Sequence, residues 1–126
     1  MMTLSKSRFV QGWSCPRKVY YGSKGKVYRN LSGENPFLQS LAEGGFQVGE
    51  LAKCYKPGGR DIKTLDEKLA ISQTYEELQK DNAIIYEGAF LWNNCFVRAD
   101  IIVKNNDNIY LYELSTNFAP VQAKKF

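Results

Sequence analysis

At 126 residues, 44% of them hydrophobic, the chain is long enough for one domain with a modest core and too short for two. Its formal charge of +4 is a mild basic excess, which is compatible with a phosphate-bearing partner but also common in proteins that bind no nucleic acid. The absence of histidine excludes Ser-His-Asp triads, Cys-His pairs and HExxH metal sites, so any chemistry falls to carboxylates, lysines, hydroxyls or thiols. No apolar run reaches the length of a membrane span and the N-terminus has no signal-peptide core, so we expect a cytoplasmic protein with no membrane partner.

The N-terminal segment predicts a broken helix followed by a loop. Ser5 or Ser7 is suited to cap a first helix, and Pro16 is expected to kink or restart it. The residues after this break, 17–21, are basic and aromatic, and glycines from Gly22 onward indicate a loop.

A second helix is predicted from Asn35, which is followed by Pro36 as in an N-cap with proline at the first helical position. Gly44 and Gly45 are expected to interrupt this helix before it resumes and ends at Pro57. The sequence therefore predicts a helix with a weak, close-packed middle.

The last part of the chain predicts one more helix and then strands. Thr64 and Glu67 have the spacing of a capping box, which indicates a helix running to about residue 81. Short runs rich in Ile, Val, Tyr and Phe follow, separated by asparagine-rich turns. The fold class is therefore α+β, with N-terminal helices followed by a three-stranded antiparallel meander. The strands are expected at 83–91, 95–104 and 109–114.

The tail from residue 116 to 126 has little periodicity and would leave the third strand as an exposed edge. Self-association through that edge is expected.

Two carboxylates lie within the apolar strands. Asp100 and Glu113 occupy positions where acids are rare without a partner. Pairing the strands about the intervening turn sets Lys104 opposite Ile109, which leaves Asp100 roughly opposite Glu113. Two acids on one face suit a hard cation such as Mg²⁺. The alternative is that Asp100 is an edge-strand acid neutralised by Arg98 or Lys104.

Segments covering nearly the whole chain resemble RecB-type PD-(D/E)XK nuclease domains. The opening is similar to the start of many such domains, where a Ser-x-Ser helix is followed by Cys-Pro, basic residues and two aromatics. The middle looks like an uncharacterised bacterial family related to these nucleases, and the strands fall where the superfamily carries an Asp and then Glu-x-Lys. In chain order the segments are LSKSRFVQGWSCPRKVYY, NPFLQSLAEGGFQVGELAKCYKPGG, EGAFLWNNCFVRADIIV and NIYLYELS.

The resemblance implies a metal-dependent DNA nuclease. Asp100 and Glu113 would bind Mg²⁺ or Mn²⁺, and Glu50 on the preceding helix would supply a further acid unless it is a solvated helix-face residue. By the same resemblance, residues 1–126 form a single partial domain, an incomplete restriction-endonuclease-like core. We accordingly expect the chain to be a fragment of a longer protein or an interrupted gene product.

The chain departs from the family pattern at Ser115, where Glu-x-Lys requires lysine. A lysine there would position the attacking water and stabilise developing charge, which serine does not do. A lysine at another position in the chain would have to replace the missing motif lysine, and the candidates are Lys104, Lys124 and Lys125. The alternative function is a degenerate, non-catalytic module that binds nucleic acid or a partner protein, and a further alternative is a plain α+β interaction module.

Two interpretations concern the basic, aromatic segment. Arg17, Lys18, Tyr20 and Tyr21 are expected to contact a DNA backbone and stack on bases, or alternatively to form a basic amphipathic helix with aromatic core contacts. In some relatives the Cys-Pro cysteine ligates an iron-sulfur cluster with three later cysteines that are not present here. No iron-sulfur cluster is therefore expected, and Cys15 is interpreted as a buried structural thiol.

Overall fold

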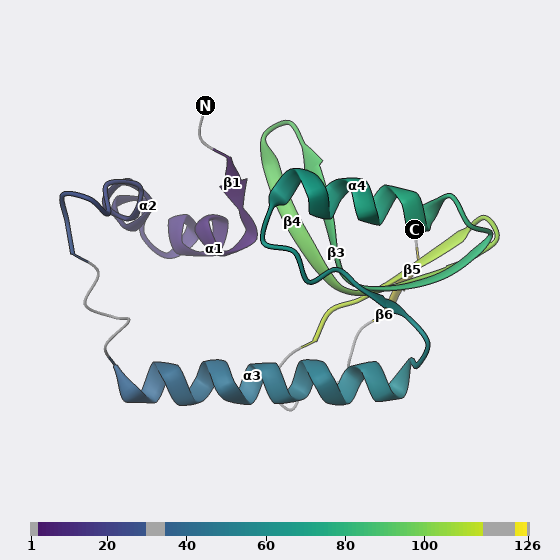
Figure 1. Cartoon of the computed structure of the whole chain (residues 1–126). Helices are drawn as coiled ribbons and strands as arrows, with labels where there is room; N and C mark the ends of the chain where they lie inside the picture. The colour runs from purple at the N-terminus through teal and green to yellow at the C-terminus, as the bar shows by residue number, and fades with distance from the viewer. Residues whose placement is uncertain (1–2, 30–34, 115–122, 126) are drawn as a thin grey trace.

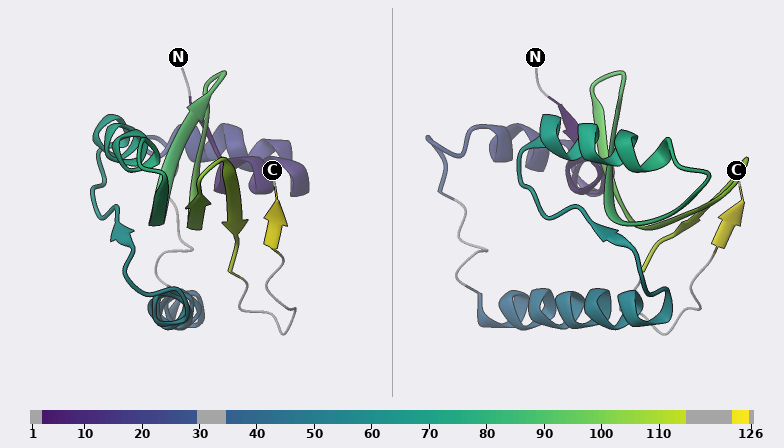
Figure 2. Two further views of the ribbon diagram at one scale, coloured as in Figure 1. Left: turned by 90° about the vertical axis from the view of Figure 1, so that its right-hand side faces the viewer. Right: turned by 45° about the vertical axis from the view of Figure 1, so that its right-hand side comes forward.

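The chain forms an α+β structure in which helices surround a mixed sheet (Figure 1 and Figure 2). This computed structural model describes residues 3–29, 35–114 and 123–125. Within these ranges, none of the helices combines the length and the apolar character needed to cross a membrane. The helices are α1 (Lys6–Ser14), α2 (Pro16–Ser23), α3 (Pro36–Tyr55) and α4 (Glu67–Leu78). The strands are β1 (Leu4–Ser5), β2 (Arg60–Asp61), β3 (Asn82–Trp92), β4 (Cys95–Asn105), β5 (Asn108–Tyr112) and β6 (Ala123–Lys125).

The sheet is mixed, which corrects the expected three-stranded antiparallel meander. The antiparallel ladder of β3, β4 and β5 forms as predicted. However, β1 adds in parallel to β4, β2 adds in parallel to β3, and β6 pairs antiparallel with β5. The strand order is β2-β3-β4-β5-β6, with β1 beside β4. Because β1 and β2 span two residues each, they are too short to show an alternating pattern in the sequence.

The sheet edge that we expected at β5 is covered in part. The pairs between β5 and β6 run from Tyr110 to Tyr112, so the outer backbone of this stretch has a partner within the chain. Of the predicted polar tail, residues 116–122 and 126 lie outside the described residues. Self-association stays a prediction.

The turns of the meander confirm the asparagine signals. Asn93 and Asn94, between β3 and β4, both have positive φ, as a two-residue turn of type I′ requires. Asn106, between β4 and β5, also has positive φ. The resulting register pairs Lys104 with Ile109, as the sequence predicted.

The predicted starts of the first three helices are confirmed. Ser5 is the N-cap of α1, and its hydroxyl accepts a hydrogen bond from the Arg8 backbone N–H at 3.3 Å. Pro16 begins a new helix as the first residue of α2. The Asn35 side chain caps α3 by accepting from the Phe37 N–H at 3.0 Å.

Two details of the later helices differ from the prediction. Helix α3 continues through Gly44 and Gly45 without a break, and a Cβ built on either glycine would meet nothing within 4 Å, so its middle is not close-packed. Helix α4 begins after Asp66, whose side chain accepts from the Leu69 N–H at 2.8 Å, rather than after Thr64. The Thr64 hydroxyl instead accepts from the Asp66 N–H at 3.2 Å and shapes the turn that precedes the helix.

The core lies mainly between α4 and the sheet. Ile71 and Leu78 of α4 pack against a buried cluster that reaches across β3 and β4. A second, smaller cluster lies toward α3, where Ala52 contacts it. The buried members of the first cluster are Ile62, Ala70, Ile85, Ala89, Ala99 and Ile102, and those of the second are Tyr86, Ile101 and Val103.

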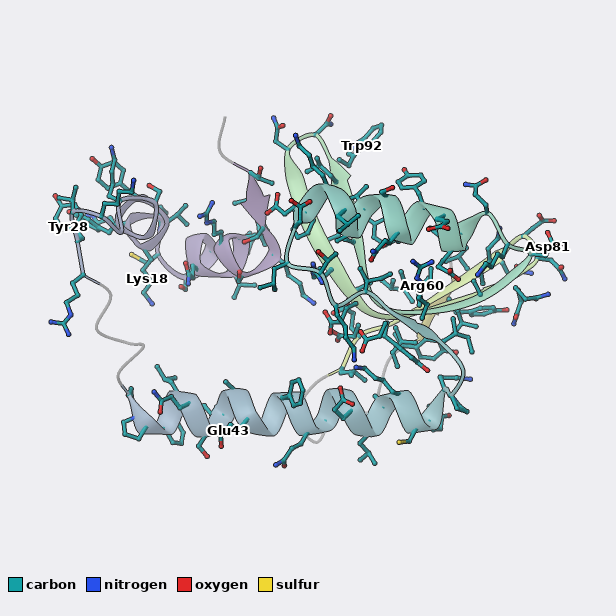
Figure 3. All side chains as sticks on the ribbon, viewed as in Figure 1. Lys18, Tyr28, Glu43, Arg60, Asp81 and Trp92 are labelled. Atoms are coloured by element: carbon teal, nitrogen blue, oxygen red, sulfur yellow. The ribbon has the colours of Figure 1, made fainter. Side chains whose placement is uncertain are left out.

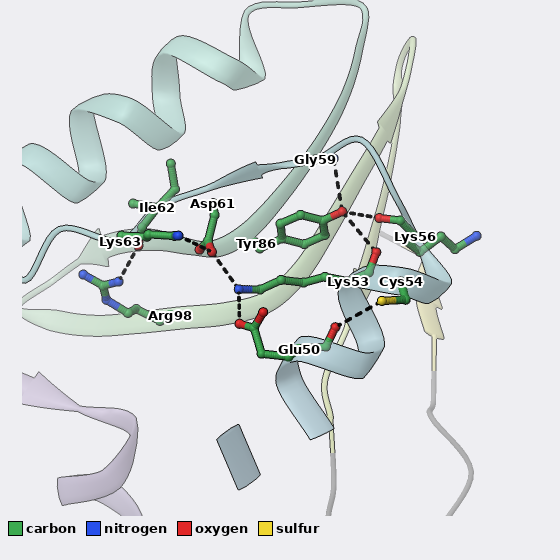
Figure 4. A network of polar contacts seen from close by, with 10 residues as sticks. All are labelled: Glu50, Lys53, Cys54, Lys56, Gly59, Asp61, Ile62, Lys63, Tyr86 and Arg98. Carbon is green, nitrogen blue, oxygen red and sulfur yellow. Dashed lines mark hydrogen bonds and ion pairs between the residues drawn. The ribbon is translucent and has the colours of Figure 1, made fainter. Parts of the chain in front are cut away.

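The C-terminal end of α3 is attached to the sheet by polar contacts (Figure 4). The Tyr86 hydroxyl donates to the Lys56 carbonyl and accepts from the Gly59 N–H. The Lys53 ammonium lies 2.6 Å from the carboxylate of Asp61 in β2. These contacts fix one end of a 20-residue helix, whereas Phe37, near its other end, is exposed.

Thr74 links α4 to β3 through a fully buried hydroxyl. Its Oγ1 donates to the Ala70 carbonyl at 2.8 Å and accepts from the Ala89 N–H at 2.9 Å. Thr74→Val keeps the shape but leaves the Ala89 N–H buried and unpaired, so we expect a loss of about 1 kcal/mol in the free energy of unfolding. Urea denaturation measures the loss, and Ser72→Ala, at an exposed position of the same helix, is the control expected to change little. Equal stability of Thr74→Val and the native chain would contradict the prediction.

Candidate functional site

Two segments of the chain approach each other along one edge of β4. Strand β3 pairs with the other edge of β4 over its whole length. On the edge of β4 that faces away from β3, β1 pairs with the start of β4 and runs parallel to it. On the same edge, β5 pairs with the end of β4 and runs antiparallel. Lys6 is the next residue after β1 and Glu113 is the next after β5. The chain directions therefore bring these two residues head-on beside β4.

Asp100 lies on β4 where the two segments meet. The last backbone pair of β4 and β5 is Ile101 with Tyr112, and one further step sets Asp100 opposite Glu113. Asp100 Oδ2 accepts a hydrogen bond from the Leu114 N–H at 2.6 Å, which holds its carboxylate toward the end of β5. The two acids predicted from the sequence are thus brought to neighbouring positions.

A third acid, which the sequence analysis did not single out, extends this line. The β3–β4 ladder pairs Tyr86 with Ile101 and Gly88 with Ala99, so Glu87 lies opposite Asp100. We call Glu87, Asp100 and Glu113 the carboxylate row. Like charges directly opposite on neighbouring strands destabilise a sheet, so a cation near this row would be stabilising. Glu87 carries the same sequence signal as Asp100, an acid inside an apolar run, and could have been found by it.

Glu87 has an unusual backbone and an unfavourable electrostatic environment. Its φ of 58° lies in the left-handed region, which side chains with a Cβ adopt at a cost. Partial burial raises the pKa of its carboxyl above the ordinary value, and the negative charge of Asp100 raises it further. Strained backbone conformations of this kind concentrate at functional sites.

The raised pKa of Glu87 predicts a pH-dependent gain in stability for Glu87→Gln. The carboxyl of Glu87 holds its proton more tightly in the folded chain than in the unfolded chain, where a glutamate has a pKa of about 4.3. The contribution of Glu87 to stability therefore falls as the pH rises from the unfolded pKa through the pKa in the folded chain. Glu87→Gln removes that loss, so we expect a higher midpoint of thermal unfolding at pH 8 and little change near pH 4, measured in EDTA. Glu43→Gln, on the exposed side of α3, is the control. A gain that is equal at both pH values would show that charge is not its cause.

Lys6 supplies a positive charge to the carboxylate row. Its ammonium forms an ion pair with Glu113. The hydrogen bond to Glu113 raises the pKa of Lys6, with smaller contributions from the charges of Asp100 and Glu87. Lys6 and Asp100 also line one cavity of about 530 Å³ together with Ser5 and Ser7. Sequence reasoning missed Lys6 because its position depends on the pairing of the two-residue strand β1 with a distant part of the chain.

The structure does not show the alternative in which Arg98 or Lys104 neutralises Asp100. The Arg98 guanidinium donates to the backbone carbonyls of Ile62 and Thr64. The Lys104 ammonium donates to the Leu78 carbonyl at 2.7 Å, at the end of α4. Lys104 is therefore directed away from the row and is not a substitute for a lysine at Ser115.

Glu50 lies across a second cavity from the row. This cavity, of about 480 Å³, lies between α3 and the sheet and is lined by Glu50, Glu87 and Asp100 among others. The Glu50 carboxylate is 2.7 Å from the Lys53 ammonium, which also contacts Asp61 (Figure 4). Glu50 thus faces the same space as Asp100, while its own charge is already paired.

The carboxylates do not form a ready-made cluster of three ligands. Within residues 3–29, 35–114 and 123–125, no group of three or more Asp, Glu, Cys or His side chains is arranged to hold a metal ion. Ser115 lies outside the described residues, as do the side chains of Lys124 and Lys125. A metal at the row would therefore have to rely on two carboxylates and water.

The basic and aromatic residues predicted to bind nucleic acid lie on α2. Arg17, Lys18, Tyr20 and Tyr21 are all exposed, and α2 has no buried residue. The alternative of aromatic core contacts is therefore wrong for this helix. In Figure 1, α1 lies between α2 and β4.

The three cysteines are free thiols. Cys15, at the start of α2, is partly buried rather than fully buried as interpreted, and Cys54 and Cys95 are exposed. They lie at the ends of different elements.

Comparison with protein-family models, with curated proteins and with solved structures found no match for this chain. The fold and the site geometry are therefore the basis for any functional conclusion.

Proposed function

We propose that the carboxylate row is a divalent-cation site and that the domain hydrolyses DNA phosphodiester bonds, as a RecB-like member of the PD-(D/E)XK nucleases would. The observation that carries the proposal is the register of the sheet. It sets Asp100 opposite Glu113 at the point where β1 and β5 meet, with Glu87 next in line on β3. Three acids at neighbouring positions with one paired lysine leave excess negative charge, which favours a cation.

The donor set is compatible with Mg²⁺ or Mn²⁺. Hard cations prefer carboxylate oxygens, and Mg²⁺ in particular is often held by one or two carboxylates with water filling the other positions. Asp100 and Glu113 provide those two carboxylates, and Glu87 and Glu50 add negative charge around them. A bound metal of this type supplies Lewis-acid stabilisation of the scissile phosphate and a more acidic water.

Lys6 has the charge and the position to complement this site. Hydrolysis of a phosphodiester places additional negative charge on the phosphate oxygens, which an adjacent ammonium stabilises. Ser115 cannot do so, but Lys6 lies beside Glu113 and shares a cavity with Asp100. In the proposed site, Asp100 and Glu113 hold the cation and Lys6 orients and neutralises the phosphate.

Cation binding is tested first, without reference to catalysis. We expect Mn²⁺ to raise the unfolding temperature of the native chain and of Asp107→Asn, a control acid in the exposed β4–β5 turn, but not of Asp100→Asn. A folded sample whose unfolding temperature does not respond to Mn²⁺ would overturn the proposal.

Nuclease activity is then tested on labelled single-stranded DNA with Mn²⁺. The samples are the native chain, Ser115→Lys, and Ser115→Lys combined with Asp100→Ala. We expect Ser115→Lys to cleave faster than the native chain and the Asp100→Ala combination to be inactive. If Ser115→Lys is folded, binds Mn²⁺ and does not cleave, hydrolysis is excluded.

A second candidate function is a non-catalytic module derived from such a nuclease, which binds nucleic acid without cutting it. The chain has Ser115 where the nuclease motif has lysine, and this difference favours the non-catalytic function. Binding of Mn²⁺ and of DNA, without cleavage by either the native chain or Ser115→Lys, is the result expected for this function.

A further inference from the structure

We propose that α2 and the turn after it form a binding groove for unpaired nucleotides of single-stranded DNA. The groove is lined by Arg17, Lys18, Tyr21, Tyr28 and Arg29 and has a volume of about 560 Å³, within the usual range of ligand pockets. This inference concerns a surface separate from the carboxylate row and does not require cleavage.

The charge of this segment is entirely positive. Between residues 3 and 29 the sequence contains seven Lys and Arg residues and no Asp or Glu. The whole chain carries 17 Lys and Arg against 13 Asp and Glu, so outside this segment the charges are mixed, with 10 Lys and Arg against 13 Asp and Glu. Such local concentration of one sign attracts a polyanion. The seven residues are Lys6, Arg8, Arg17, Lys18, Lys24, Lys26 and Arg29.

The aromatic rings of this segment are exposed and in contact with one another. The Tyr21 ring centroid lies 5.4 Å from that of Tyr20 and 4.9 Å from that of Tyr28, both in edge-on geometry. All three rings retain roughly half of their surface or more, at 59% for Tyr20, 47% for Tyr21 and 49% for Tyr28. Because they do not contribute to the core, packing does not explain why three tyrosines gather here. Exposed rings beside cations form the usual stacking platform for unpaired bases.

The arrangement favours single-stranded nucleic acid over a membrane surface. Figure 3 shows Tyr28 beyond α2, at the end of the α1–α2 pair farthest from the sheet, and Lys18 on α2 itself. Val19, the one aliphatic side chain of α2, is partly buried against Gly12, and Val27 in the turn after α2 is exposed, so this segment offers a single exposed aliphatic side chain rather than an aliphatic face to insert among lipid chains. It also favours unpaired over duplex nucleic acid, because the bases of a duplex are stacked on one another and leave no free faces for tyrosine.

The test is fluorescence anisotropy of a labelled 15-nucleotide oligo-dT with the full chain in EDTA, at salt concentrations from 50 to 300 mM. We expect Tyr21→Ala and Tyr28→Ala each to weaken binding roughly 10-fold with an unchanged salt dependence. Arg17→Gln with Lys18→Gln should weaken binding and make the salt dependence shallower. The negative slope of log K against log salt should decrease in magnitude by about 1.4, since each phosphate contact to a single strand contributes about 0.7. Lys63→Gln with Lys68→Gln, at two exposed positions that do not line the groove, is the matched charge control and should leave both quantities nearly unchanged. Circular dichroism verifies that each variant is folded.

Several outcomes would overturn the proposal. Two concern the variants: tyrosine variants that bind oligo-dT normally, or a loss of affinity in the Lys63 and Lys68 control equal to that of the Arg17 and Lys18 variant. The others concern the ligand: no binding of oligo-dT, duplex DNA that binds as tightly as oligo-dT, or binding to anionic phospholipid vesicles that oligo-dT does not displace. Asp100→Asn separates this inference from the proposed function, because it should bind oligo-dT normally even though it no longer responds to Mn²⁺. Normal binding by Asp100→Asn, together with no cleavage by either the native chain or Ser115→Lys, would retain the groove and reject hydrolysis.

Discussion

Lys6→Gln is expected to lower Mn²⁺-dependent cleavage of single-stranded DNA roughly 100-fold, the loss typical for removal of one charge-stabilising group from an active site. Lys6 is the lysine that pairs with Glu113, and it lines the cavity that also contains Asp100. The chain should still fold, because the Lys6–Glu113 pair is largely exposed and such pairs contribute little to stability. Cleavage rates at saturating Mn²⁺, with unfolding temperatures measured on the same samples, provide the test.

The matched variants separate charge from other effects of this substitution. Lys6→Arg retains the positive charge and should keep part of the activity. Lys68→Gln removes a lysine from an exposed position of α4 and should change nothing. If a lysine at position 115 performs the same task, Ser115→Lys should restore cleavage to Lys6→Gln. Full activity of Lys6→Gln in the native background would show that the ammonium beside Glu113 is not part of the site.

Gly88→Ala is expected to lower the free energy of unfolding by about 2 kcal/mol, because a methyl group there overpacks the core. A Cβ at Gly88 would overlap Ile102 Cδ1, whereas the nearest atoms of Ile85 and Thr74 would lie at 3.4 Å, an ordinary contact distance. Ile102 is itself almost completely buried at 1% exposure, so its side chain has little room to move away. Chemical denaturation measures the loss.

A second substitution tests the cause of that loss. Ile102→Val removes Cδ1 and alone should cost about 1 kcal/mol. Combined with Gly88→Ala, it opens the space that the new methyl group needs, so the double variant should be more stable than the sum of the two losses predicts. Gly44→Ala, on α3 where nothing lies within 4 Å, is the control and should be neutral or stabilising. Strictly additive losses would exclude the contact with Ile102 as the cause.

Local signals in the sequence predicted much of this structure. The cap of Asn35, the restart at Pro16 and the asparagine turns at positive φ each depend on a few adjacent residues, and each is confirmed. The register of β4 and β5 followed from the turn between them, and it set Asp100 opposite Glu113.

The sequence did not predict features that depend on distant pairing. Strands β1 and β2 are each two residues long and exist only because β4 and β3 offer them an edge. Lys6 follows β1, so its place beside Glu113 could not be deduced from neighbouring residues. The prediction of a break at Gly44 and Gly45 was wrong because it gave a local signal too much weight. A long helix with a good N-terminal cap tolerates the modest cost of two glycines.

The attachment of α3 at one end has a consequence for how the protein opens. Tyr86, Lys53 and Asp61 fix the last turns of the helix, whereas its first turns, with Phe37 and Leu38 exposed, have few contacts to lose. Local opening there costs much less than global unfolding, which requires separating β3 from β4. Backbone amides of the first turns of α3 should therefore exchange with deuterium well before those of β3 and β4, and a protease should be able to cut the start of α3 while the sheet stays intact.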